Sequence, residues 1–168
     1  MRNFLRVSCE PNSERRERAI PIGMLAHILA SSRKHRNVSV GAYFSGVVVP
    51  ALRHQKVNLY FDERGDPVGY FIWVLLAPET ENRILQSGLM QLHESEFTES
   101  GTAWVVDFAA PFGHAAFVLS QGLQTLSTLS STFRYIRRSR ERFWIREFEI
   151  DSALRLLHKR TTVDGVAS

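Results

Sequence analysis

The fold is decided by two neighbouring segments, Val57-Asn-Leu-Tyr-Phe-Asp62 and Val68-Gly-Tyr-Phe-Ile-Trp-Val-Leu-Leu76. The first alternates in polarity, the second is almost continuously apolar, and Glu63-Arg-Gly-Asp-Pro67 between them has the glycine and proline of a turn. Together they predict a β-hairpin. A continuously apolar strand is covered on both faces, whereas an alternating strand keeps one face in water. We therefore expect the first strand at the edge of a sheet and the second inside it.

Further elements on both sides of the hairpin predict an α+β fold. Apolar spacing indicates helices at 22–30, 40–53, 78–87, 114–126 and 152–159, and strands at 102–108, 133–136 and 143–150. Pro50 should kink or divide the second helix, because proline lacks an amide hydrogen. This order predicts a single-domain α+β sandwich with helices packed on a mixed or antiparallel sheet. We expect the domain at residues 21–160, between a polar N-terminal tail at 1–20, in which residues 11–18 form a solvated tail or an irregular helix, and a C-terminal tail at 161–168.

Composition narrows the class of protein. The 168 residues are 44% hydrophobic and 23% charged, which suits a packed core and argues against disorder. No apolar run approaches the roughly 18 residues of a membrane span, and the N-terminal segment lacks the apolar centre of a signal peptide. Cys9 is the single cysteine and cannot form an internal disulfide. We expect a soluble, cytoplasmic protein.

The positive charge is carried almost entirely by arginine. The net charge is +4, and the 21 basic residues include only three lysines, Lys34, Lys56 and Lys159. Arginine makes forked contacts with carboxylates and phosphates, so an acidic or phosphorylated partner is expected, without a choice between nucleic acid, protein and cofactor. The strands near the C-terminus concentrate this charge in Arg134, Arg137, Arg138, Arg140, Arg142 and Arg146.

Asp107 is the residue that demands a partner. It lies between Trp104-Val-Val and Phe108-Ala-Ala in the most apolar part of a predicted strand, where an unpaired carboxylate is costly. Two interpretations stay open on the residues alone: Asp107 caps the turn before Pro111, or it orients a catalytic histidine. Six histidines are candidates. His35 has the most suitable setting, in a polar loop with hydroxyl and basic neighbours.

Four motifs carry a resemblance to a known family. They are Ser31-Ser-Arg-Lys-His-Arg-Asn37, Val49-Pro-Ala-Leu-Arg53, Asp66-Pro-Val-Gly-Tyr-Phe-Ile-Trp73 and Trp104-Val-Val-Asp-Phe-Ala-Ala-Pro-Phe-Gly113. In order and separation, from about Met24 to Ile150, they resemble the toxin-activating lysine-acyltransferases, the hemolysin C-type activators of RTX toxins. The resemblance implies a GNAT-like fold, a homodimer, and transfer of a fatty acyl group from acyl carrier protein to internal lysines of an RTX-type protoxin.

The resemblance also implies the site residues. The catalytic histidine falls on His35, the catalytic aspartate on Asp107, and a serine associated with activity on Ser32. Neutral His35 would act as general base on the lysine amine, and Asp107 would fix its tautomer and stabilise the imidazolium. Ser32 would hold the loop or donate to the thioester oxygen, and an acyl-histidine route stays open. No metal and no tightly bound cofactor are expected, because the phosphopantetheine thioester of acyl carrier protein arrives as a co-substrate.

The loop around His35 departs from the family pattern. Family members usually have proline before the histidine and a Trp-Pro pair after the Arg-Asn or Arg-Asp, whereas this chain has Arg33-Lys34 before His35 and Val38-Ser39 after Asn37. The difference bears on the choice of acyl chain or protein substrate more than on the class of reaction.

The arginine cluster has competing interpretations. Acyl carrier proteins of this kind are acidic, so Arg134, Arg137, Arg138, Arg140 and Arg142 are predicted to dock the carrier protein. Alternatively, the charges only protect an edge strand from pairing with other sheets. Aromatic residues between the arginines also suit a non-enzymatic module that binds single-stranded nucleic acid or an acidic protein. That alternative leaves Asp107 unexplained, and His35 with Asp107 argues against a catalytically silent relative. We therefore expect an enzyme that does not bind nucleic acid.

Overall fold

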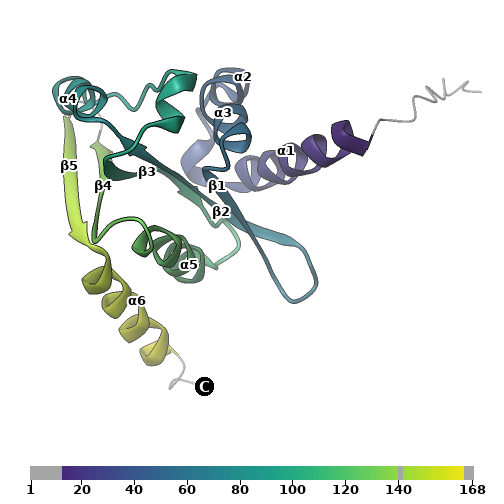
Figure 1. Ribbon diagram of the computed structural model, residues 1–168. Coiled ribbons are helices and arrows are strands. Elements are labelled where there is room, and N and C mark those ends of the chain that lie inside the picture. The colour runs from purple at the N-terminus through teal and green to yellow at the C-terminus, as the bar shows by residue number, and fades with distance from the viewer. Residues whose placement is uncertain (1–12, 140–141, 165–168) are drawn as a thin grey trace, which may run out of the picture.

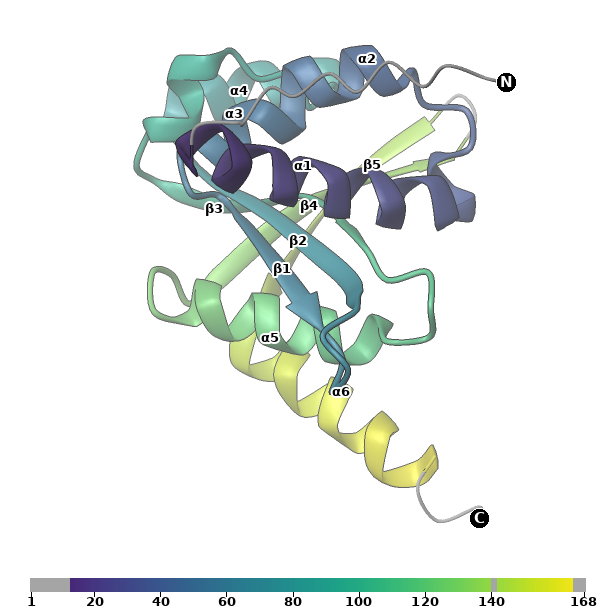
Figure 2. The same ribbon diagram turned by 90° about the vertical axis from the view of Figure 1, so that its right-hand side faces the viewer.

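A computed structural model describes residues 13–139 and 142–164, which form helices on both faces of one five-stranded sheet (Figures 1 and 2). The strands are β1 (Val57–Phe61), β2 (Pro67–Leu76), β3 (Thr102–Ala109), β4 (Thr132–Ser139) and β5 (Arg142–Glu149). The longer helices are α1 (Ser13–Ser31), α4 (Pro78–Ser87), α5 (Ala115–Ser127) and α6 (Ile150–Asp164). The shorter helical segments are η1 (Arg33–His35), α2 (Val40–Tyr43), η2 (Phe44–Val48), α3 (Val49–Arg53) and η3 (Glu94–Thr98).

The sheet is mixed, and its strands follow one another in chain order from β1 to β5. Antiparallel pairs join β1 to β2, β2 to β3 and β4 to β5, whereas β3 and β4 run parallel and pair only at Trp104–Arg134 and Val105–Tyr135. The predicted hairpin is confirmed: β1 is an edge strand, and Val68 to Val74 of β2 are all buried. The predicted α+β class and helix-covered sheet are therefore correct.

Two hydrophobic cores fill the two faces of the sheet. On one face, α1, α3, α4 and η3 pack over β2 and β3, with Leu25, Ile28, Ile84, Phe97 and Trp104 fully buried. On the other, α5 and α6 pack over residues that include Phe71, Val105 and Leu123. Figure 2 shows α1 to α4 on one side of the sheet and α5 and α6 on the other. Among the helices described, none is long and apolar enough to cross a membrane.

Several element boundaries differ from the sequence-based expectation. Helix α1 begins at Ser13, inside the segment expected as a polar tail, and α6 continues to Asp164, inside the expected C-terminal tail. Strand β4 extends to Ser139, so part of the predicted link between the last two strands is itself strand. These extensions are polar, and a polar segment lacks the apolar periodicity by which an element is recognised. η3 was not predicted at all.

The backbone stays helical on both sides of Pro50, so the chain is not interrupted there as a division of the helix would require; only the hydrogen-bond pattern changes, and α3 begins at Val49 with Pro50 in its first turn. The preceding turn, Phe44–Val48, is π-helical.

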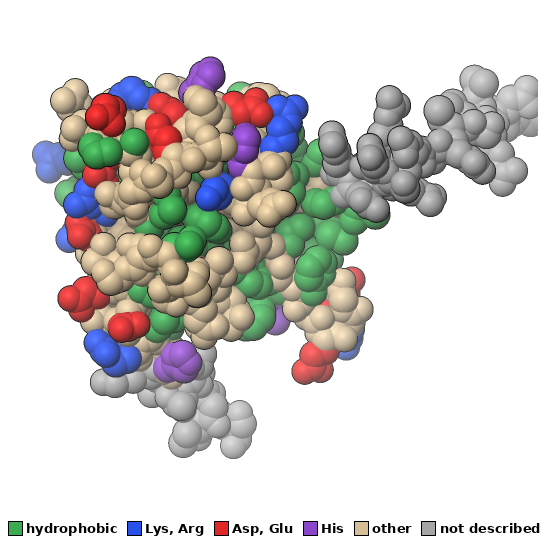
Figure 3. Space-filling view, viewed as in Figure 1, with side chains coloured by type: hydrophobic (Ala, Val, Ile, Leu, Met, Phe, Trp, Pro, Cys, Tyr) green, Lys and Arg blue, Asp and Glu red, His purple; other side chains and the backbone are tan. Residues whose placement is uncertain are grey.

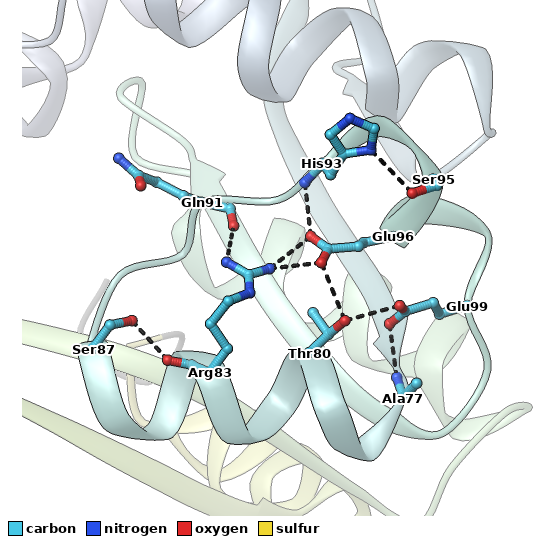
Figure 4. Close-up of polar contacts among 9 residues, drawn as sticks. All are labelled: Ala77, Thr80, Arg83, Ser87, Gln91, His93, Ser95, Glu96 and Glu99. Carbon is cyan, nitrogen blue, oxygen red and sulfur yellow. Dashed lines mark hydrogen bonds and ion pairs between the residues drawn. The ribbon is translucent and has the colours of Figure 1, made fainter.

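A cluster of hydrogen bonds and an ion pair joins η3 to α4 (Figure 4). Arg83 donates two hydrogen bonds of 2.7 Å to the Glu96 carboxylate, and Thr80 donates to both Glu96 and Glu99. Burial would raise the pKa of Glu96, but the His93 amide and Arg83 outweigh it and hold that pKa below its ordinary value. The cluster holds η3 against α4, with Phe97 of η3 buried in the core.

Candidate active site

A β-bulge in β3 places Asp107 on the face of the sheet that α1 covers. Ile72 of β2 pairs with Asp107, but the next residue, Trp73, pairs with Val105, so β3 carries one extra residue, Val106. Alternate strand residues face opposite sides, and without the bulge Asp107 would lie on the α5 face with Val105. The extra residue turns Asp107 to the face of Ile72 instead.

The three residues predicted as catalytic meet at this point. Helix α1 ends at Ser31, and the short η1 turn that follows places Ser32 and His35 over the sheet. His35 Nε2 lies 2.8 Å from Asp107 Oδ2, and His35 Nδ1 lies 2.8 Å from Ser32 Oγ. All three side chains are buried. Of the two interpretations of Asp107, the structure supports the one in which its carboxylate pairs with a histidine.

Two tyrosines complete the surroundings of the carboxylate. The Tyr70 hydroxyl donates to Asp107 Oδ2 at 2.8 Å, and the Tyr43 hydroxyl donates to the same oxygen at 2.5 Å. The two hydroxyl oxygens lie 3.2 Å apart. Sequence reasoning missed both residues, because Tyr43 and Tyr70 resemble ordinary core positions of a helix and a strand. The only available signal was the buried carboxylate itself, which needs donors without specifying where they come from.

Lys34 contacts the other carboxylate oxygen. Its Nζ lies 2.5 Å from Asp107 Oδ1 and 5.7 Å from the centre of the Phe108 ring. The Lys34 side chain is 63% exposed, although its partner carboxylate is buried. The positive charge of Lys34 therefore approaches the Asp107 carboxylate from the solvent side of the site.

These contacts determine the charge state of the site. Burial would raise the pKa of Asp107, but the hydrogen bond from His35 and the charge of Lys34 outweigh it and hold that pKa well below its usual range. Burial, followed by the nearby Asp107 charge, raises the pKa values of Tyr43 and Tyr70 well above the ordinary tyrosine value. At neutral pH the site thus contains an ionised aspartate held by neutral tyrosine donors.

An ionised Asp107 selects one tautomer of neutral His35. The carboxylate can only accept, so the histidine proton lies on Nε2 and donates to Asp107. Nδ1 then carries the lone pair and accepts from the Ser32 hydroxyl. The arrangement can take up a proton at Nδ1 and stabilise the resulting imidazolium through Asp107.

The predicted docking arginines divide into separate groups. Arg134 forms ion pairs of 2.7 Å with Glu81 and Glu147, and Arg138 donates to the Gly88 carbonyl. These contacts bind β4 to α4 and β5. Arg137 and Arg142 are exposed, and Arg140 lies outside the described residues.

The exposed arginines lie at the active-site end of the sheet. Because β3 and β4 are parallel with Val105 opposite Tyr135, Arg137 follows Tyr135 in the direction in which Asp107 follows Val105. In Figure 2 the β4–β5 hairpin ends on the same side of the molecule as the connection from α1 to α2. Trp144 pairs with Arg137 across the hairpin and is 41% exposed.

An apolar groove opens beside α1. Its volume is about 540 Å³, and it is lined by Ala19, Ile20, Gly23, Met24, His27 and Pro67. Hydrophobic side chains gather on the surface around α1 in Figure 3. Among the residues described, no group of three or more histidine, cysteine, aspartate or glutamate side chains is placed to hold a metal ion.

Comparison with known proteins places the chain in a family. The sequence profile of the RTX toxin acyltransferase family matches residues 15–148, a range that contains Ser32, His35 and Asp107. The chain belongs to the RTX toxin acyltransferase family. The family resemblance expected from the motifs is therefore confirmed.

Individual members of the RTX toxin acyltransferase family are distant relatives of this chain. It is 30% identical over 97 residues to the RTX-II toxin-activating lysine-acyltransferase ApxIIC of Actinobacillus pleuropneumoniae, covering 58% of this chain and 59% of that protein. It is 30% identical over 77 residues to the leukotoxin-activating lysine-acyltransferase LktC (serotype T3) of Mannheimia haemolytica, covering 46% and 45%. The lysine-acyltransferase RtxC of Vibrio cholerae is 24% identical over 99 residues, covering 59% and 63%. The matches thus span about half to three fifths of these relatives.

Proposed function

We propose that the protein is a lysine acyltransferase that moves a fatty acyl group from acyl carrier protein to internal lysine ε-amines of an RTX-type protoxin and thereby activates it. The observation that carries the proposal is the buried Ser32–His35–Asp107 arrangement in a chain of this family. The three relatives described above are lysine acyltransferases by name, and the names of two of them state that they activate a toxin.

His35 is the general base in this reaction. A lysine ammonium has a reference pKa of about 10.4, and only the neutral amine attacks a thioester. His35 Nδ1 takes the proton, Asp107 stabilises the imidazolium, and the imidazolium returns the proton to the departing thiolate. Base catalysis by a positioned side chain contributes about 100- to 10,000-fold in rate. Ser32, which already donates to Nδ1, is placed to turn toward the thioester oxygen as the imidazole becomes charged.

A covalent route through His35 uses the same geometry. Nδ1 then attacks the thioester carbonyl, and the acyl-imidazole passes the acyl group to the lysine amine. Rapid quenching with acyl donor alone separates the routes, because an acyl-imidazole accumulates only in the covalent one.

The acyl donor is proposed to approach the end of the β4–β5 hairpin. Arg137 and Arg142 are exposed there, and an acidic carrier protein would be attracted to them. The apolar groove beside α1 offers the kind of surface that a fatty acyl chain requires. The donor would bring its own phosphopantetheine arm, so the chain would need no resident cofactor, and the reaction would take place in the cytoplasm.

Fold and assembly are further parts of the proposal. A central parallel pair, β3 and β4, joined at only two residue pairs within a mixed sheet supports a GNAT-like arrangement. Strand β5 is an edge strand with Phe143, Trp144 and Phe148 partly exposed, which supports a homodimer, since exposed apolar edges are usually covered. Sedimentation equilibrium tests the dimer: a monomer at micromolar concentration contradicts it.

The decisive experiment is the intact mass of a co-expressed RTX protoxin. We expect one acyl increment per modified lysine with the wild-type protein, and none with His35→Ala or Asp107→Ala. Absence of any increment with the wild type would overturn the proposed function. Acylation at wild-type levels by either variant would overturn the assignment of the site. Retention of all three proteins on single-stranded DNA without acylation would favour the nucleic-acid-binding alternative.

A charge reversal tests the docking of the carrier protein. The double variant Arg137→Glu/Arg142→Glu should weaken carrier-protein binding and flatten its dependence on salt, because rim charges act mainly on association. Arg64→Glu, in the exposed turn between β1 and β2, is the matched control and should bind as the wild type does. Equal binding by all three proteins contradicts docking at this surface.

A further inference from the structure

The side chain of Lys34 places an amine of the enzyme itself at the candidate active site. Its Nζ is 2.5 Å from Asp107 Oδ1, while His35 Nε2 is 2.8 Å from Oδ2 of the same carboxylate. The amine and the imidazole are therefore held by the two oxygens of one side chain. Such an amine is the chemical group on which a lysine acyltransferase acts.

Lysine is a rare residue in this chain. Lysine supplies only three of the 21 basic residues, and arginine, which does not accept acyl groups from thioesters at neutral pH, supplies the rest. Packing does not account for a lysine at this position, because the side chain is 63% exposed and fills no part of the core.

We propose that Lys34 is an acyl acceptor within the enzyme itself, and that in the absence of protoxin the acyl group of the thioester donor is transferred to Lys34 Nζ. The inference rests on the proposed function. A bond forms between Nζ and the carbonyl carbon, and the bond between that carbon and the donor sulfur breaks. Nζ loses two protons on going from ammonium to amide: one is released to water, and His35 removes the other and passes it to the sulfur, leaving a free thiol on the donor. The product is a stable amide.

The position of Lys34 favours this reaction, and acylation would remove the positive charge that Lys34 holds beside Asp107. Lys34 adjoins His35 in the chain and shares the Asp107 carboxylate with it, so its amine reacts as part of one molecule and avoids the entropic cost of bringing two molecules together. The exposure of Lys34 lets its stem swing from Asp107 toward a bound thioester. Once acylated, Lys34 is uncharged and no longer forms the ion pair, so Asp107 loses one of the two groups that lower its pKa.

The test is incubation of the full-length protein with acyl carrier protein carrying a palmitoyl group, without protoxin. Intact mass after treatment with alkaline hydroxylamine counts only amide-linked acyl groups, because thioesters, serine esters and acyl-imidazoles are cleaved. Peptide mass spectrometry then locates the acyl group. We expect a single amide on Lys34, none at this position in Lys34→Arg, and at least about 100-fold slower modification in His35→Ala.

Lys56 provides an internal control. Its Nζ lies 4.3 Å from the centre of the Trp73 ring, and burial lowers its pKa, so more of it is neutral amine. Trp73 belongs to the core on the α5 face, away from Asp107. Spontaneous acylation by the thioester would therefore mark Lys56 at least as readily as Lys34. Labelling of Lys34 at an unchanged rate in His35→Ala, or mainly on Lys56, overturns the inference.

A parallel reaction with protoxin separates this inference from the function on which it rests. If the same enzyme preparation acylates protoxin but leaves Lys34 unmodified when protoxin is omitted, self-acylation is refuted and the proposed function stands. If neither the protoxin nor Lys34 is modified, the proposed function fails and the inference fails with it.

Discussion

Replacing Asp107 by asparagine is the most informative perturbation of this site. The carboxylate accepts hydrogen bonds from His35, Tyr43 and Tyr70 at Oδ2 and from Lys34 at Oδ1. Asparagine has nearly the same shape, but it offers one accepting oxygen and carries no charge. Its NH₂ group faces a donor on whichever side it lies, so at least one of these donors loses its partner.

The expected loss of stability follows from this count. Leaving a buried donor without its acceptor typically costs about 1–3 kcal/mol. For a chain of this size each kcal/mol lowers the melting temperature by about 2–4 °C, so the variant should melt roughly 2–12 °C below the wild type. Loss of the orienting carboxylate also releases the Nε2–H tautomer of His35, and in a comparable arrangement the reaction slows by about ten-thousand-fold.

The sign of the pH dependence is set by the lowered pKa of Asp107. A lowered pKa in the folded state adds stability above the unfolded value of about 3.9, and this contribution is lost as the pH falls below it. Asparagine has no such titration. The difference in unfolding free energy between wild type and Asp107→Asn should therefore be constant at pH 5–7 and shrink as the pH falls below about 4.

Calorimetry from pH 3 to 7, with acylation rates measured well below both melting temperatures, checks these expectations. Glu81→Gln is the matched control, because Glu81 is also a shielded carboxylate, accepting bonds from Trp104 and Arg134, but it does not contact His35. It should lose stability while retaining acylation. The reasoning is refuted if Asp107→Asn melts within 2 °C of the wild type, or if it acylates protoxin within about threefold of the wild-type rate.

Three further predictions concern other parts of the molecule. Gly122→Ala would place a Cβ 2.4 Å from the buried Phe71 ring, and overpacking should lower stability by about 1–3 kcal/mol by chemical denaturation; an unchanged midpoint contradicts the close approach. Because the pKa values of Tyr43 and Tyr70 are raised in the folded protein, the wild type loses stability as the pH rises above about 10. The double variant Tyr43→Phe/Tyr70→Phe should therefore show a smaller drop in melting temperature between pH 9 and 11 than the wild type does. An equal drop in the two proteins argues against buried neutral tyrosines. Glu81→Ala should destabilise more than Glu81→Gln, because it removes every acceptor for the donors around it, and equal thermal stability would contradict this.

Much of the fold could be predicted because its signals are local. The apolar run at 68–76 predicts an interior strand whatever surrounds it, and α4 has the predicted bounds, Pro78–Ser87, because proline marks its start and glycine follows its end. The bounds of α1 and α6 could not be predicted, since their first and last turns are polar and are stabilised by the rest of the helix.

The sequence predicted some residues of the candidate site and missed the contacts that depend on strand register. Burial of Asp107 follows from its neighbours, and motif resemblance selected His35 and Ser32. The bulge at Val106 that turns Asp107 to the correct face depends on the register between β2 and β3, and register is a property of two strands.

The sequence by itself determined the class of fold, the family, and the need of a buried carboxylate for a partner. Only the tertiary structure decided that Tyr43, Tyr70 and Lys34 share that carboxylate with His35, and that Arg134 forms an ion pair with Glu81 of α4. The physical reason is the range of the forces involved. Hydrophobic periodicity is written into neighbouring residues, whereas a hydrogen bond forms only between groups that the folded chain brings within about 3 Å.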